Sequence, residues 1–373
     1  MQHTRHPGFR FNLQETAGAV GDYGTLIPIV LGVAIVSHVH IGYILLSFSL
    51  WYIITGLYYR LPVPVEPMKV VAAIVIAEGM MPAEIAASGI LLGLFFLLLG
   101  LFGGMRVIER VVPHDVIRGI QLGLALILFK TSLGFMLDDY LLAAIAIAII
   151  VFFFIAARFR TIPDLSALVV LAFGIGMGLL HHGCPSIVLL SPPQIIIPDL
   201  NSLWTGLWSL TVPQIPLTIT NAILATALLM QDLLKRDIDT NRLSITIGLM
   251  NLTSAPFGGF PLCHGVGGLA AQYRFGARTG GSNIISGLIL LPLALFFADP
   301  AWISLFPVSV FGSLLLFISF ELGRQGIKTE NYTVTGTVAA VALLSDITIA
   351  FITGMALSYC FQWLRRRRRQ GQD

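Results

Sequence analysis

Charged side chains are scarce in this sequence of 373 residues. Lysine and arginine together number 22 and aspartate and glutamate 19, which is 11% of the chain, whereas 56% of the residues are hydrophobic. A soluble globular protein carries about 25% charged residues, so these few charges cannot cover a protein of this size in water. The composition excludes a cytosolic enzyme, a nucleic-acid-binding protein and a secreted disulfide scaffold. It predicts a multi-pass integral membrane protein in contact with lipid.

Cysteine and clustered metal ligands are also rare. Cys184, Cys263 and Cys360 lie far apart without C-x-x-C spacing, which is typical of small residues in apolar surroundings. The adjacent Cys263 and His264 have no further ligand nearby, so we expect no metal site, and the sequence indicates no cofactor. The first ten residues lack the pattern of a cleavable signal peptide, so the first apolar segment is expected to remain in the mature protein.

Apolar stretches bounded by charge, proline or glycine predict twelve membrane-spanning helices. They cover residues 17–36, 41–59, 85–104, 117–137, 140–157, 166–180, 212–230, 243–255, 283–298, 303–320, 332–344 and 348–364, with a proline-rich loop from 183 to about 209. Two further apolar segments, 62–79 and 258–273, are too short and interrupted to cross the about 30 Å hydrocarbon core as helices. The sequence therefore predicts an all-α membrane protein with 14 transmembrane segments.

The basic residues predict the orientation, because cytoplasmic loops of membrane proteins carry an excess of lysine and arginine. Two of the 22, Lys69 and Lys130, lie within spans. With the N-terminus in the cytoplasm, all the others fall on the cytoplasmic side: Arg5, Arg10, Arg60, Arg106, Arg110, Arg118, Arg158, Arg160, Lys235, Arg236, Arg242, Arg274, Arg278, Arg324, Lys328 and the run 365–369. Both termini are predicted to be cytoplasmic, in a plasma membrane of the bacterial inner-membrane type. No cytoplasmic regulatory domain is expected.

The two interrupted segments occupy corresponding positions, third and tenth of fourteen. Division into halves of seven, residues 1–182 and 183–373, gives the halves opposite topology because seven is odd. Segments interrupted by glycine and proline at matching positions of inverted repeats indicate a transporter's substrate site. Close packing of helices at the glycines is the alternative interpretation.

Each interrupted segment is expected to begin extended and to continue as a half-helix near the membrane centre. Proline fixes φ and disfavours helix in the preceding residue, so residues 62–65 are predicted to be extended, with a helix from about Pro67. Residues 258–263 repeat this pattern. The two helix N-termini would face each other and offer N–H groups to an anion. The residues expected to bind substrate there are Pro67, Met68, Lys69, Cys263, His264, Gly265 and Gly267.

Polar residues in the first and eighth spans extend this predicted site. Asp22 and Thr25 lie in the first span, and the eighth has Gln214, Thr218 and Asn221 at i, i+4 and i+7, on one helical face. Polar groups in hydrocarbon are costly, so they normally face a cavity or each other. Hydrogen bonding between helices is the alternative role for the threonines.

Glu66 is ionisable and stands at the predicted start of a half-helix. It either pairs with Lys69 one turn on, or it is protonated when an anion is bound, which would couple a proton to the anion. We therefore include Glu66 in the substrate site. Asp22 and His264 are the other candidates for carrying the proton.

Four stretches resemble a known family. The string FGGFPLCHGVGGLAAQYRFGARTGGS (257–282) is similar to the signature of the molybdate transporter family, a branch of the sulfate permease superfamily. PVPVEPMKVVAAIV (62–75) resembles the second family signature, which usually has glutamine at the position of Glu66. GAVGDYGTLIPIVLG (18–32) and VPQIPLTITNAI (212–223) resemble family stretches of the first and eighth spans.

The resemblance implies two structural domains. Segments 1–4 (about 10–105) and 8–11 (about 205–299) would form a core domain that holds the substrate. Segments 5–7 (about 112–182) and 12–14 (about 300–364) would form a gate domain, and transport would be an elevator-like movement of core against gate. Related folds often dimerise through the gate domain, which makes a homodimer an expectation of the resemblance.

The sequence thus predicts a secondary active transporter and not an enzyme. The first hypothesis is a proton-coupled importer of a tetrahedral oxyanion, molybdate before sulfate, bound by backbone N–H groups of the half-helices together with Thr25 and Gln214. A nucleobase/proton symporter of the same fold is the first alternative, because a carboxylate at Glu66 suits ring N–H donors. A channel or non-transporting membrane scaffold is the second.

Overall fold

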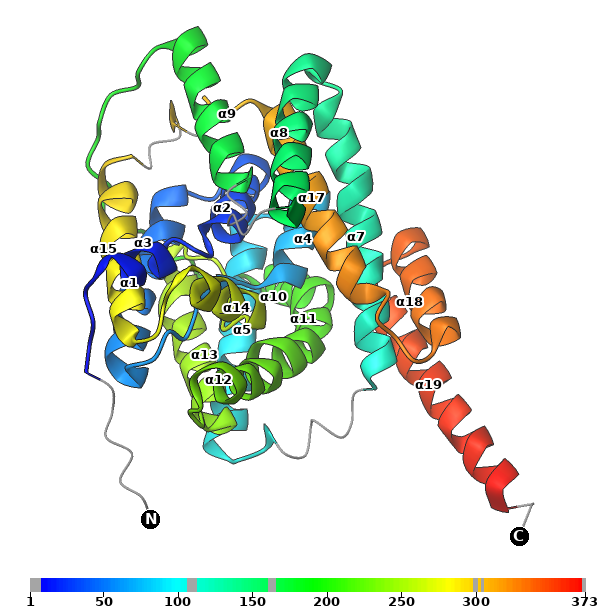
Figure 1. Ribbon diagram of the computed structural model, residues 1–373. Helices are drawn as coiled ribbons and strands as arrows, with labels where there is room; N and C mark the ends of the chain where they lie inside the picture. Colours follow the sequence, from blue (N-terminus) through cyan, green and yellow to red (C-terminus); the bar gives the residue numbers. More distant parts are fainter. Residues whose placement is uncertain (1–7, 106–112, 160–165, 298–300, 303–304, 371–373) are drawn as a thin grey trace.

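The computed structural model describes residues 8–105, 113–159, 166–297, 301–302 and 305–370, and within them the chain is mostly helical (Figure 1). The helices are α1 Leu13–Ala19, α2 Tyr23–Ser37, α3 Ile41–Tyr59, α4 Lys69–Glu78, α5 Pro82–Leu101, α7 His114–Met136, α8 Tyr140–Phe159, α9 Ser166–His182, α10 Leu200–Thr205, α11 Val212–Leu217, α12 Thr226–Leu234, α13 Thr240–Ser254, α14 Val266–Phe275, α15 Gly280–Phe296, α17 Val308–Gly326, α18 Tyr332–Leu344 and α19 Ile347–Gln370. Arg5, Arg106, Arg110 and Arg160, which support the predicted orientation, lie outside the described residues, as do the side chains of Arg158 and of the run 365–369.

The first predicted span, 17–36, is not one continuous helix. It consists of α1 and α2, which are separated at residues 20–22, and Asp22 is the N-cap residue of α2. Glycine disfavours helix, and here Gly18 and Gly21 pack closely against Ala277 and against Phe275 and Ala271. The break therefore places the Asp22 carboxylate at a helix start, which a straight span would not do.

The predicted loop from 183 to about 209 is too long. Helix begins at Leu200, because the Asp199 carboxylate accepts a hydrogen bond from Ser202 N at 2.8 Å and caps the first turn. The helix then continues for 35 residues, Leu200–Leu234, through α10, α11 and α12. Two stretches of it, Gly206–Thr211 and Thr218–Ala225, have the wider π-helical turn. They flank Pro213 and Pro216, which lack the N–H that a regular α-helix would use there.

Six helical stretches of the described residues, with α1 and α2 counted together, are long and apolar enough to cross a membrane. They are Leu13–Ser37, Ile41–Tyr59, Pro82–Leu101, His114–Met136, Leu200–Leu234 and Val308–Gly326. A seventh span results if α14 and α15, which meet at 99°, are counted as one. Shorter apolar helices stand at four more predicted spans, namely Tyr140–Ala156, Ser166–His182, Tyr332–Leu344 and Ile347–Trp363. The count of fourteen crossings stays a prediction.

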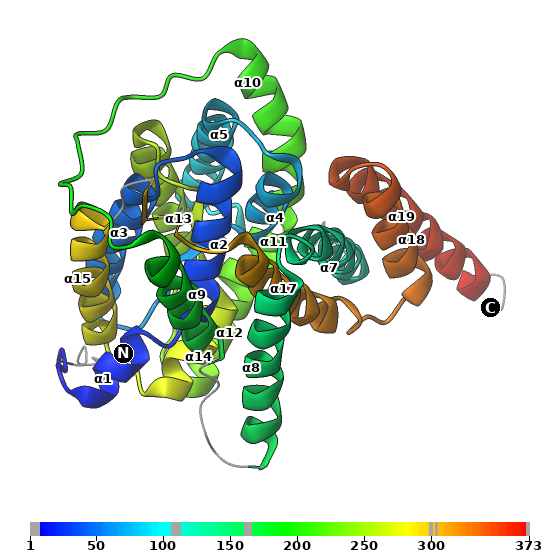
Figure 2. The same ribbon diagram turned by 90° about the horizontal axis from the view of Figure 1, so that it is seen from above.

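The long helices pack in pairs drawn from distant parts of the chain (Figures 1 and 2). Helix α3 lies along α15, α5 along α13, and α7 along α17 and α18. Small residues allow this close approach in a membrane. A side chain at Gly56 would meet the carbonyl oxygen of Gly280, and one at Gly93 would meet the backbone of Leu252.

The two interrupted segments meet in the middle of the molecule. Glu66–Pro67 forms strand β1 and Leu262–Cys263 forms β2, and the two pair antiparallel, with Glu66 opposite Cys263. Each strand is followed by a helix of ten residues, α4 or α14. This agrees with the expected extended stretch and half-helix, and it brings the first turns of both half-helices to one place.

Two asparagine side chains hydrogen-bond to the backbone of these extended stretches. The Asn251 side chain accepts from Leu262 N at 2.9 Å and donates to Leu262 O at 2.7 Å, so it satisfies the backbone of β2. Asn283 donates its amide to Val63 O and to Thr55 Oγ1. Both asparagines are fully buried. Non-helical backbone is tolerated inside a membrane protein only where such partners exist.

Candidate functional site

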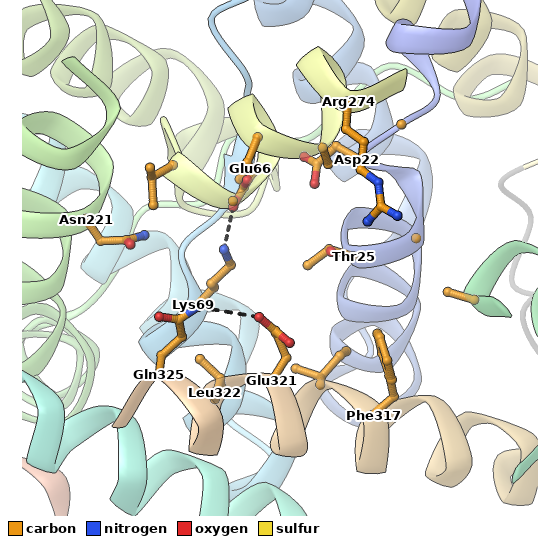
Figure 3. Close-up of a pocket in the computed structure, with 18 of the residues that line it drawn as sticks. Asp22, Thr25, Glu66, Lys69, Asn221, Arg274, Phe317, Glu321, Leu322 and Gln325 are labelled. Atoms are coloured by element: carbon orange, nitrogen blue, oxygen red, sulfur yellow. Dashed lines mark hydrogen bonds and ion pairs between the residues drawn. The ribbon is translucent and has the colours of Figure 1, made fainter. Parts of the chain in front are cut away.

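A cavity of about 420 Å³ lies beside the paired strands (Figure 3). One wall is made by the start of α2, by Glu66 and Lys69, by Asn221 and by α14. The facing wall comes from α7, α9 and α17. The cavity therefore stands between helices that the sequence assigns to the core and helices that it assigns to the gate.

Six of the residues proposed from the sequence line this cavity: Asp22, Thr25, Glu66, Lys69, Asn221 and Gly267. Figure 3 shows the side chains of the first five pointing into a common space. Asp22 and Glu66 are almost completely buried, whereas Lys69 retains 20% exposure of its side chain. Two carboxylates and one ammonium group thus share the site.

Glu66 is held by the first turn of the opposite half-helix. Its Oε1 accepts a hydrogen bond from the backbone N–H of Gly268 in α14, and its Oε2 lies 2.7 Å from Lys69 Nζ. A Cβ at Gly265 or at Gly268 would collide with this carboxylate, so only glycine leaves room for it. The carboxylate occupies part of the anion-binding end of α14.

Two further N–H groups of that helix end, those of Val266 and Gly267, face the cavity. Among the described residues, no acceptor is hydrogen-bonded to the N–H of Val266 or Gly267. Both residues line the cavity, and Gly267 is exposed to it. A Cβ at Gly267 would lie 3.6 Å from Lys69 Nζ, so these backbone donors and the ammonium group face the same small volume.

The Asp22 carboxylate lies close to Gly268 and is not fully hydrogen-bonded. Its Oδ2 is buried and has no hydrogen-bond partner among the described residues. A Cβ at Gly268 would lie 2.7 Å from the same oxygen, which places it near the Glu66 carboxylate that Gly268 also contacts. A buried carboxylate oxygen without a donor is costly, and a proton or a cation would satisfy it.

Gln214 and Thr218 do not line the cavity; they complete the start of α4. Gln214 Oε1 accepts from Val70 N at 2.9 Å and from Val71 N at 3.2 Å, and its Nε2 donates to Thr218 Oγ1 at 2.8 Å. Gln214 Oε1 therefore has both of its hydrogen bonds within the protein, and Thr218 accepts one of the two Nε2 hydrogens. The π-helical turn beginning at Thr218 separates Asn221 from this pair and leaves Asn221 at the cavity.

His264 also lies outside the cavity. Nδ1 is 2.8 Å from Pro64 O and Nε2 is 2.7 Å from Thr246 Oγ1, and the ring is fully buried. Because a carbonyl oxygen only accepts, Nδ1 carries a proton and donates it, and Nε2 accepts from Thr246. A neutral imidazole satisfies both contacts, so His264 joins the two extended stretches.

Cys263, Gly265, Pro67 and Met68 belong to the strand pair and the helix starts rather than to the cavity wall. Cys263 Sγ lies 4.0 Å from Pro67 O, and Met68 N donates to Pro261 O at 2.9 Å. Their contribution is to fix the backbone on which Glu66 and Lys69 stand. Among the described residues, no group of three histidine, cysteine, aspartate or glutamate side chains is placed to hold a metal ion.

Several cavity residues were not proposed from the sequence. Arg274 of α14 extends toward α2, and Glu321 and Gln325 of α17 face it from the other wall (Figure 3). Gln121 of α7 also lines the cavity and is nearly buried. Arg274 was counted only as a cytoplasmic charge, and Glu321 lies just beyond the predicted span 303–320, so neither gave a signal of a binding role.

The comparison with known sequences identifies relatives over most of the chain. The family model described as "Molybdate transporter of MFS superfamily" matches residues 14–128 and 206–322. Molybdate transporter 2 of Arabidopsis thaliana is 33% identical over 402 residues, which cover 92% of this chain and 86% of that protein. Molybdate transporter 1 of the same plant is 31% identical, with 96% and 90% covered.

Solved structures share the fold. The transmembrane domain of a cyanobacterial bicarbonate transporter, BicA, superimposes with a TM-score of 0.69 at 19% identity, covering 94% of this chain and 98% of that one. The murine anion transporter solute carrier 26 family member A9, in its inward-facing state, gives 0.69 at 14% identity, covering 95% and 69%. The family model and the two plant relatives confirm the resemblance found in the sequence motifs: this chain belongs to the molybdate transporter family, and these homologues are transporters, not enzymes.

Proposed function

We propose that this protein is a secondary active transporter that imports a tetrahedral oxyanion, with molybdate the first candidate and sulfate the second. The observation that carries the proposal is the cavity at the start of α14, where the N–H groups of Val266 and Gly267 and the Lys69 ammonium face one volume. The names of the two Arabidopsis thaliana relatives, molybdate transporters 2 and 1, favour molybdate.

In the proposed complex the oxyanion sits against the α14 N-terminus. Val266 and Gly267 donate from the backbone, and Lys69 donates from its ammonium group. Thr25 and Asn221 line the same volume and offer a hydroxyl and an amide. Gln214 and His264 act on the framework instead, Gln214 by capping α4 and His264 by linking the two strand segments.

Proton coupling follows from the charges. An unprotonated Glu66 competes with the substrate for Lys69 and for the end of α14. Protonation of Glu66 removes that competition and releases Lys69 for the anion. Asp22, whose Oδ2 lacks a donor among the described residues, is the second proton carrier. The other charged groups that line this cavity are Arg274 and Glu321, both exposed at its rim.

We propose further that the chain is an inverted repeat, residues 1–182 and 183–373, which crosses the membrane fourteen times with both termini in the cytoplasm. The packing supports this: exchanging segments seven apart converts the α3–α15 pair into the α13–α5 pair, and both are extensive. The same exchange maps the β1–β2 pair and the α7–α17 pair onto themselves. A bacterial-type inner membrane, a homodimer and elevator-like movement of the core (about 10–105 and 205–299) against the gate (about 112–182 and 300–364) belong to the same proposal.

The test is uptake of labelled molybdate into proteoliposomes with an inward proton gradient, against excess sulfate or uracil. Saturable uptake that collapses when the gradient is dissipated, and that uracil does not inhibit, is the expected result. Gly267→Val should block it, because the new side chain fills the space in front of Lys69. Gly336→Val on α18, where nothing lies within 4 Å of the added Cβ, is the matched control and should transport normally. Uptake of labelled uracil in place of molybdate would overturn the substrate class while leaving the fold intact.

A further inference from the structure

A second cavity, of about 600 Å³, lies between α7, α8 and α17. Its lining is almost wholly apolar, and several of the side chains are exposed large hydrophobic groups: Leu126, Phe129, Phe154 and Phe320. Arg324 is the one charged residue among the described residues that line it. An apolar groove with a single cation at one end has the chemistry of an anionic amphiphile's binding site.

The dimensions fit one leaflet of a membrane. On α17 the lining residues run from Ser313 to Arg324, a rise of about 16 Å at about 1.5 Å per residue. Half of the hydrocarbon core is about 15 Å. At one end of the groove α17 and α8 touch, where Ser313 Oγ donates to Ala143 O at 3.1 Å. Arg324 lies in the last turn of α17, at the opposite end.

Arg324 makes only a weak ion pair and can bind a further anionic group. It contacts Glu321 at 3.9 Å, and both side chains are about half exposed, with 55% and 49% relative exposure. A contact of this length and exposure stabilises little. A phosphate group offers several acceptor oxygens to the planar guanidinium at shorter range.

We infer that this groove binds an anionic phospholipid, with one acyl chain between α7, α8 and α17 and the headgroup phosphate on Arg324. The groove also adjoins the anion cavity, because Phe317 lines both and Glu321 lines the anion cavity while pairing with Arg324.

Binding is tested on the purified full-length protein by native mass spectrometry with phosphatidylglycerol and with phosphatidylcholine of identical chains. We expect one tightly retained phosphatidylglycerol per protomer, with phosphatidylcholine at least tenfold weaker. Arg324→Gln should abolish this headgroup preference. Lys328→Gln, which removes a charge at the same end of α17 but does not line the groove, is the matched control and should keep it. Leu126→Trp, at an exposed groove residue, should weaken both lipids by filling the space.

Three results would overturn the inference. If Arg324→Gln and Lys328→Gln lost the preference for phosphatidylglycerol to the same extent, the preference would come from the general surface charge and not from the groove. Lipid retention unchanged by Leu126→Trp would place the lipid elsewhere. A dimer that becomes monomeric in Leu126→Trp, with the same lipid count, would assign the groove to a second copy of the chain. Because binding is measured without transport, failure of the molybdate proposal would not affect these readings.

Discussion

The charges at the anion cavity predict how many protons accompany each oxyanion. With Asp22 and Glu66 ionised and Lys69 protonated, the empty site carries one net negative charge. A dianion adds two more, which is costly at a buried position. Protonation of both carboxylates restores the charge of the empty site, so we expect two protons per oxyanion. Glu66→Gln replaces one carboxyl with a permanently neutral amide, and we expect one proton per oxyanion in that variant.

The magnitude follows from the gradient. One pH unit contributes about 1.36 kcal/mol per proton, or tenfold in accumulation. At zero membrane potential the wild-type protein should therefore accumulate the oxyanion about hundredfold per pH unit and Glu66→Gln about tenfold. Two protons with a dianion move no net charge, so the wild-type ratio should not depend on potential. The variant moves one net negative charge with each oxyanion. Moving that charge against 100 mV costs about 2.3 kcal/mol, so an inside-negative potential of about 100 mV should lower accumulation by the variant about fiftyfold.

The assay is the equilibrium accumulation ratio of labelled molybdate in proteoliposomes, with the potential clamped by potassium and valinomycin. Glu78→Gln removes a carboxylate from the far end of the same half-helix, outside the cavity, and should keep the wild-type ratio. A hundredfold, potential-insensitive ratio in Glu66→Gln would refute Glu66 as a proton carrier. A tenfold ratio in the wild-type protein would refute the two-carboxylate count.

Three further predictions concern neighbouring residues. Gly268→Ala should reduce transport more than tenfold and destabilise the protein by about 1–3 kcal/mol, because the added Cβ collides with the Glu66 carboxylate; a thermal-unfolding scan and uptake measure both, and normal uptake would contradict the geometry. His264→Leu should lower the unfolding temperature, since Pro64 O and Thr246 lose their partner at a cost of about 1–3 kcal/mol, while the protons moved per oxyanion stay at two; a changed ratio would return His264 to the proton path. Arg274→Gln should raise the KM severalfold at low salt and little at high salt, because a rim charge acts by long-range attraction; a salt-independent loss would indicate direct contact instead.

The sequence was informative where backbone chemistry decides the structure. Proline fixes residues 62–65 as extended and glycine disfavours helix at 258–263, so the two strand–helix units follow from local preferences. The polar residues Asp22, Thr25, Glu66 and Asn221 were identified from the sequence because polar groups in an apolar span are energetically costly and normally face a cavity or each other.

What the sequence did not reveal depends on distant contacts. Gln214 has the appearance of a substrate ligand, yet it caps α4, and this is visible only when Val70 and Val71 are placed beside it. His264 was proposed as a proton carrier because of its ordinary titration range, but Pro64 and Thr246 bind both of its ring nitrogens. The spacing of Gln214 and Asn221 was interpreted for a regular α-helix, which would place both on one helical face. The π-helical turn from Thr218 to Ala225 changes the number of residues per turn and separates them.

The pairing of β1 with β2 also sets the order in which the molecule is assembled. Pro64 and His264, 200 residues apart in the chain, meet through one hydrogen bond, and the strands on either side depend on each other. A ribosome that has released only the first half leaves the carbonyl and N–H groups around Val63–Pro67 without partners, and hydrocarbon penalises each of them by several kcal/mol. The backbone groups of β1 therefore obtain their hydrogen-bond partners only after Leu262 and Cys263 have been synthesised. The centre of the protein can form only after the chain has been made as far as β2, so a fragment that contains only the first half lacks the α14 wall of the substrate site.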